Sequence, residues 1–170
     1  IEIENDGYDD KTYEKDSEFF LWRDTVFKAF SDKSIAIKDR LEINNEKICS
    51  KEIFNKYLTL EILDSVCQEK IKELIKAYDN IKNITIPKEF DDCFEQLLLY
   101  FSYRHLSLLL DGKEENNILS FIKSSASVIF SLCQLHIKKF GKLTIDDIIE
   151  YSRMYSSEIE YSQENLDELI

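Results

Sequence analysis

Glycine and proline are scarce in this chain, which has three glycines and one proline among 170 residues. Sheet-rich folds and doubly wound α/β folds need many tight turns, and tight turns draw on these two residues. Their scarcity argues against such folds and favours long helices joined by short polar loops. Apolar and polar residues also do not alternate over more than four positions. The sequence therefore predicts a single all-α domain, a bundle of about six to eight helices.

Several motifs that carry chemistry are missing as well. The sequence has no G-x-G-x-x-G, no P-loop, no G-x-S-x-G and no H-E-x-x-H. Its cysteines, Cys49, Cys67, Cys93 and Cys133, are dispersed and form no C-x-x-C pair. Dispersed thiols are typical of a reducing compartment, so we expect a cytoplasmic protein. We predict no catalytic, cofactor-binding or metal-binding residue in this chain.

Basic charge is in short supply, and what there is lies in the middle of the chain. The formal net charge is −12. Residues 1–18 hold eight acidic and two basic side chains, and residues 144–170 hold eight acidic ones and Arg153. Nucleic-acid binding needs a basic face, so we expect no nucleic-acid partner. The acidic ends suit a basic or lysine-bearing protein, or else they serve only as solvated segments.

The most apolar stretch, residues 118–137, is long enough to resemble a membrane span. It includes Lys123, Gln134, His136 and several serines, which a central buried helix tolerates better than a lipid bilayer does. We therefore predict a core helix here and no membrane contact.

Capping residues divide the chain into helices. Residues 1–15 are acidic and lack periodicity, so they predict an arm or linker before a helical domain over 16–170. Between residues 50 and 78 the pattern fits either one long helix or two helices with a kink near Thr59. The predicted N-caps are Asp16 or Ser17, Ser34, Ser50, Thr144 and Ser162, and Gly112 and Gly141 are the predicted stops.

A polar cluster, Tyr100, Tyr103, Arg104 and His105, interrupts an otherwise apolar predicted helix. A buried Arg104 would need a carboxylate, and Glu158 and Glu160 are the candidates. We interpret the cluster as a salt bridge that ties the C-terminal segment to this helix. A site for the carboxylate of a ligand is the alternative.

Glu158 and Glu160 are two residues apart, so on a helix their side chains point in nearly opposite directions. Only an extended segment would let them act together on one substrate atom, and we expect them to be anchors and not catalysts. The only histidines, His105 and His136, lie on the two most apolar predicted helices. Each is interpreted as a hydrogen-bonded core residue. A metal protein or small enzyme that uses both is the weaker alternative.

The C-terminal run from Leu143 to Ile170 resembles the end of flagellin lysine-N-methylase-like proteins. In that family the chain closes with Leu-Thr, two acids, a helix, Tyr-Ser, Lys-Glu-Ile-Glu-His-Ser and Glu-Glu-Asn-Leu. Two more stretches, Phe94–Leu106 and Phe19–Leu41, are similar in order and spacing. Tyr161 stands where the family often has His. The matching residues are Leu143, Thr144, Asp146, Asp147, Tyr155, Ser156, Glu158, Ile159, Glu160, Ser162, Glu164, Asn165 and Leu166.

This resemblance implies a part of a bacterial enzyme that methylates lysines of flagellin with S-adenosylmethionine. Family members carry an N-terminal C-x-x-C-x-x-C-C segment taken to hold an iron–sulfur cluster, and this chain lacks it. The chain also starts at Ile1 and not at Met. The resemblance therefore implies a non-catalytic C-terminal domain that docks the cluster domain or the flagellin substrate. The alternative is a free-standing helical interaction or regulatory module.

Overall fold

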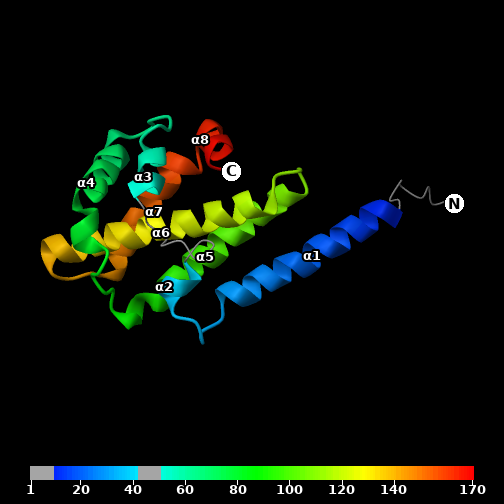
Figure 1. Ribbon diagram of the computed structural model, residues 1–170, viewed down its shortest axis with the longest axis horizontal. Coiled ribbons are helices and arrows are strands. Elements are labelled where there is room, and N and C mark those ends of the chain that lie inside the picture. The colour runs from blue at the N-terminus through cyan, green and yellow to red at the C-terminus, as the bar shows by residue number, and fades with distance from the viewer. Residues whose placement is uncertain (1–9, 42–50) are drawn as a thin grey trace.

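Helix α6, Glu115–Phe140, lies at the centre of the fold (Figure 1). The computed structural model describes residues 10–41 and 51–170, and within these ranges it describes side chains from residue 17 onward. The described part of the chain contains eight α-helices and no strand, which confirms the all-α prediction. The other α-helices are α1 (Asp10–Phe30), α2 (Ile37–Arg40), α3 (Lys51–Tyr57), α4 (Ser65–Ile81), α5 (Asp91–His105), α7 (Ile145–Ile159) and α8 (Gln163–Leu169).

Three helices, α4, α5 and α7, pack directly on α6. Helix α5 enters through the 3₁₀ turn η1 (Lys88–Phe90) and leaves through η2 (Leu106–Leu109), after which the chain turns back into α6. Both α5 and α7 therefore run antiparallel to α6 (Figure 1). Helix α1 packs on α5, and its first turns extend past the end of the α5–α6 pair (Figure 1).

The predicted central helix is confirmed, because the side chains of α6 from Ser124 to Leu135 are all buried. Helix α6 is also the one described helix that is long and apolar enough to span a membrane. In this structure 72% of its most apolar 18-residue window is buried inside the protein. A core helix passes the same test of length and composition, so the test carries little weight here.

Several predicted helix ends agree with the structure, but the helix predicted to stop at Gly112 ends earlier: α5 ends at His105 and the 3₁₀ turn η2 ends at Leu109. Gly141 ends α6 with a left-handed φ of +73°, which glycine adopts without strain. Thr144 begins α7 with a capping box: its side chain accepts from the Asp147 amide, and the Asp147 side chain accepts from the Thr144 amide. Ser162 caps α8 by accepting from the Asn165 amide.

Two helix starts differ from the prediction, and the structure decides one boundary that the sequence left open. Helix α1 begins at Asp10 and not at Asp16 or Ser17, because the segment between them holds no residue that breaks a helix. Residues 1–9 of the predicted arm, and the predicted cap Ser50, lie outside the described residues. The second helix is only one turn long, and its N-cap position is held by Ala36 and not by Ser34, without a side-chain cap. Two separate helices, α3 and α4, resolve the alternative near Thr59.

A buried ion pair, which the sequence did not reveal, joins the N-terminal helices to α5. The Arg40 guanidinium donates to Glu95 Oε2 and to the Phe30 carbonyl oxygen, both at 2.6 Å. The side chains of Arg40 and Glu95 are 5% and 9% exposed. Removing one partner of such a pair leaves an uncompensated charge in the core.

We predict that Glu95→Ala lowers the free energy of unfolding by about 3 kcal/mol, because Arg40 then stays buried without its carboxylate. Urea unfolding followed by circular dichroism measures this loss. Asp92→Ala is the matched control, because it removes the exposed Lys33–Asp92 pair one turn earlier on α5, and it leaves the unfolding midpoint unchanged. Equal losses in the two variants would show that burial of the Arg40–Glu95 pair does not stabilise the fold.

Candidate functional site

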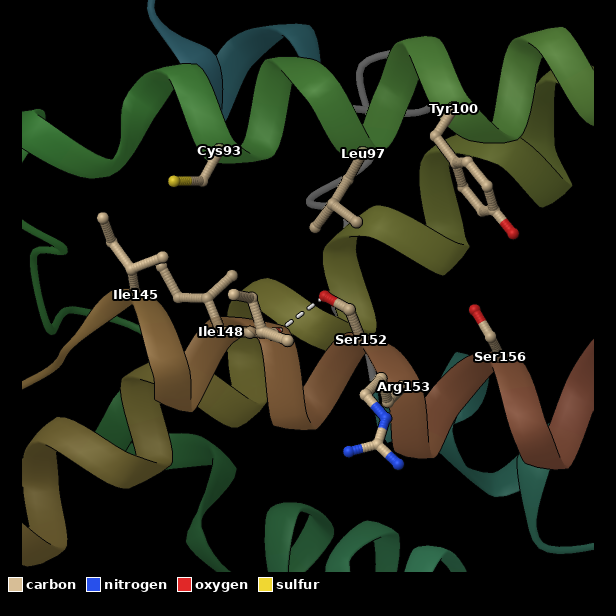
Figure 2. A pocket seen from close by; sticks show the side chains of 9 residues that line it. Cys93, Leu97, Tyr100, Ile145, Ile148, Ser152, Arg153 and Ser156 are labelled. Atoms are coloured by element: carbon tan, nitrogen blue, oxygen red, sulfur yellow. Dashed lines mark hydrogen bonds between the residues drawn. The ribbon is translucent and has the colours of Figure 1, made fainter.

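A groove of about 430 Å³ runs between α5 and α7 (Figure 2). Both helices pack on α6, and the groove is the space that remains between them. In Figure 2 the two helices run in the same direction, and most of the labelled side chains lie between them, whereas the Arg153 side chain points away from α5. Its lining is Cys93, Leu97 and Tyr100 from α5, and Ile145, Ile148, Ile149, Ser152, Arg153 and Ser156 from α7.

Apolar side chains dominate the groove and remain exposed at its rim. Ile148 lies buried in its wall, whereas Ile145, Ile149 and Tyr100 are 57%, 51% and 43% exposed. A row of exposed large apolar residues around a hollow is typical of a surface that binds a partner.

The polar groups of the groove are not arranged for acid–base or nucleophilic chemistry. Its nine lining side chains include no histidine, carboxylate or lysine. The Ser152 hydroxyl donates to the Ile148 carbonyl oxygen at 2.7 Å. Burial, and next the Asp92 charge, raise the pKa of the Cys93 thiol, so this thiol stays protonated and poorly nucleophilic. The groove is therefore suited to binding an apolar surface.

Tyr100 links the groove to a carboxylate centre at the C-terminal end of α5. Its hydroxyl donates to Glu160 Oε2 at 3.0 Å, while Arg104 Nε and His105 Nε2 lie 3.0 and 3.1 Å from Glu160 Oε1. The Glu160 side chain is 2% exposed. The predicted tie between the C-terminal segment and this helix is therefore present, with Glu160 as its carboxylate.

Hydrogen bonding sets the charge state of this centre. Burial raises the pKa of the Glu160 carboxyl, but hydrogen bonds from His105, Ser156 and Tyr100 and the Arg104 charge outweigh burial. The pKa of Glu160 is consequently held below its ordinary value of 4.5, and the group is ionised near neutral pH.

Two details of the predicted tie were wrong. Arg104 is not buried, because its side chain is 49% exposed. Glu158 is not its partner: the Glu158 carboxylate accepts from the amides of Leu63 and Asp64, at 3.2 and 2.7 Å. Helix α7 continues through Ile159, so the two carboxylates point to different parts of the fold.

Asn165 and Ser162 complete the attachment that Glu158 begins. The Asn165 amide group accepts from the Glu61 backbone N–H at 2.8 Å and donates to the carbonyl oxygens of Glu61 and Glu158. The Ser162 hydroxyl donates to Glu61 Oε2 at 2.8 Å. We call residues 158–165 the C-terminal clamp, because they hold the α3–α4 connection and the end of α5 in place.

The remaining candidate residues are divided between core and surface. Tyr155 is buried, and its hydroxyl donates to Ser125 Oγ and lies 2.8 Å from the Tyr57 hydroxyl. Burial is the largest cause that raises the pKa of Tyr155 well above its ordinary value. Tyr103 is 83% exposed and faces solvent.

The two histidines do not meet. His105 packs edge-on against Phe121 near the start of α6, whereas His136 lies near its end, 3.0 Å from the Tyr151 hydroxyl through Nδ1. Within the described ranges, no group of three or more His, Cys, Asp or Glu residues could hold a metal ion. Nothing in that part of the chain supports a metal site built from the two histidines.

Sequence reasoning missed the groove, because helical periodicity alone does not show whether one helix presents one apolar face or two. In the structure α7 has two: Ile148, Tyr155 and Ile159 enter the core, while Ile145 and Ile149 border the groove. The sequence does hold a signal for the second face, because the apolar stripe of α7 is wider than one packing partner covers.

A family model described as the FliB lysine N-methylase C-terminal domain matches residues 2–170. Searches of the curated proteins and of the solved structures gave no significant match.

We predict that Glu158→Ala lowers the free energy of unfolding by about 2 kcal/mol, because the part-buried amide hydrogen bonds of Leu63 and Asp64 lose their charged acceptor. Amide hydrogen exchange at these two positions should also accelerate. Glu164→Ala is the matched control, since Glu164 is an exposed residue of α8. Unchanged exchange in Glu158→Ala would contradict the attachment of the α3–α4 connection.

A pH dependence follows from Glu160. Because its pKa is lower in the folded state than in the unfolded chain, its stabilisation is present above the ordinary pKa and is lost as pH falls through the folded value. We predict that unfolding free energy falls less steeply below about pH 4.5 in Glu160→Gln than in the wild type. Chemical unfolding at a series of pH values measures the two slopes. Identical slopes, with Glu164→Gln as control, would contradict the assignment.

Proposed function

This chain belongs to the FliB lysine N-methylase C-terminal domain family, and from that premise we propose that it is a non-catalytic docking domain of a lysine N-methylase. It holds either the cluster-bearing part of the same enzyme or the flagellin substrate, and methyl transfer takes place outside it. The observation that carries this proposal is the open apolar groove between α5 and α7, with three large side chains exposed at its rim.

The hydrogen bonds and ion pairs of the candidate side chains support a non-catalytic role. Glu158 and Glu160 are occupied by backbone amides and by Arg104, His105 and Tyr100. Carboxylates held in this way are poorly placed to take up or release a proton during a reaction.

The described cysteines do not fit an iron–sulfur cluster. Cys67 and Cys133 are buried, Cys93 lines the groove, and the three lie on three different helices. A cluster needs thiolates that converge on it, whereas burial raises the pKa of Cys67 to about 12 and keeps it protonated. We therefore assign the cluster and the S-adenosylmethionine site to the rest of the enzyme.

Charge favours a basic protein partner. The chain carries a net charge of −12, which attracts a lysine-bearing surface and repels nucleic acid. Flagellin fits this description, because the residue on it that is methylated is a lysine. The free, mostly buried thiols suit the same cytoplasmic setting in which flagellin would meet the enzyme.

A binding experiment with a methylation assay tests the proposal. The isolated domain is titrated with the flagellin of the same organism and, separately, with the rest of its enzyme, and then assayed with flagellin and S-adenosylmethionine. We expect saturable binding of at least one partner and no methyl transfer by the domain alone. Methyl transfer by the domain would refute the non-catalytic role, and failure to bind either partner would refute docking.

A further inference from the structure

We propose that the α5–α7 groove binds an amphipathic α-helix of the partner, with lysine or arginine on the polar face of that helix. This inference rests on the proposed docking function and specifies the shape and charge of what docks. Three features carry it: the spacing of the lining residues, the directions of the surrounding helices, and the charge around the groove.

The lining residues have the spacing of helix-packing seams. On α5 they are Cys93, Leu97 and Tyr100, separated by four and then three residues. On α7 the row Ile145, Ile149, Ser152 and Ser156 is separated by four, three and four. A repeat that averages 3.5 residues keeps one stripe facing a neighbouring helix along its length. Two such seams facing one another define a position for a third helix.

None of the helices in the described part of the chain lines the groove besides α5 and α7. Helices α5 and α7 both run antiparallel to α6 and both pack on it (Figure 1). A helix laid between them on the side away from α6 would complete a four-helix arrangement. The seam from Ile145 to Ser156 is roughly 16 Å long at 1.5 Å per residue, which fits about three turns of the incoming helix.

The charge near the groove selects a basic helix. Asp146 and Glu150 are exposed on α7 beside the seam. Arg153, the only base among residues 144–170, lines the groove and is paired with Glu150 at 3.3 Å, so these two charges offset each other and Asp146 keeps its negative charge beside the seam. Residues 144–170 therefore attract lysine or arginine on the flanks of the occupant. The same charge opposes a second copy of this domain, since each copy carries −12.

Model helices test the inference. The probe is a fluorescent peptide of about 18 residues, or five turns, with leucine at alternating four- and three-residue spacing and lysine on the opposite face. One control peptide replaces each lysine with glutamate, and another has the same composition in scrambled order. We expect the lysine helix to bind saturably by fluorescence anisotropy, the glutamate helix to bind at least about tenfold more weakly at low salt, and the scrambled peptide not to bind.

Domain variants locate the binding. Ile149→Glu removes an exposed apolar side chain from the seam and adds an acid, so a contact driven only by charge would strengthen. We expect at least about tenfold weaker binding instead, because the loss of apolar contact dominates. Leu21→Glu is the matched control, because Leu21 is 71% exposed on α1, and it leaves affinity unchanged. Unfolding midpoints confirm that both variants fold.

Several results would overturn the inference. These are equal binding of the scrambled peptide, equal effects of the two variants, no binding of the lysine helix, or a dimer of the domain that Ile149→Glu dissociates. The same variants are also titrated with flagellin and with the rest of the enzyme. If a partner binds Ile149→Glu as tightly as the wild type, the groove is not the docking surface, although the docking function stands. If neither partner binds the wild type, the docking function is wrong. The peptide titrations then decide separately whether the groove binds a lysine-bearing amphipathic helix.

Discussion

Burial of α6 is the constraint on which the rest of this structure depends. A helix so apolar must be covered on several sides, and α4, α5 and α7 cover it. Its small residues allow close approach, and their hydroxyls are satisfied within the helix: Ser125 and Ser127 donate to the carbonyl oxygens of Phe121 and Lys123, both at 2.7 Å. Helices α5 and α7 are both held against α6, and the groove is the space that this packing leaves between them.

The C-terminal clamp then fixes the outer helices relative to this core. Glu158 and Asn165 bind backbone groups of the α3–α4 connection, and Glu160 binds the end of α5. Tyr100 belongs both to the groove and to the Glu160 centre, so the clamp also sets the position of one groove wall. The clamp residues Glu158, Glu160 and Asn165 belong to the run that resembles the family. They help to position the groove walls, although they do not line the groove.

Local features of the fold could be predicted from sequence, whereas most tertiary pairings could not. The caps at Thr144 and Ser162, the stop at Gly141 and the buried α6 follow from neighbouring residues, and the structure has them. The pairing of Glu160 with Arg104 was accessible because a charge on an apolar helix demands a partner. The pairs Arg40–Glu95 and Asn165–Glu61 join residues 55 and 104 positions apart, and helical periodicity carries no information about which helices meet.

The central claim is that the apolar seams of α5 and α7 form the surface through which this domain docks. Its most direct test is a backbone-amide NMR titration of the isotope-labelled domain with the partner it binds, flagellin or the rest of the enzyme. The account predicts that shift changes concentrate in residues 93–100 and 145–156, with those of the clamp following weakly through Tyr100. Shift changes confined to α1 or to the connection between α3 and α4 would contradict it.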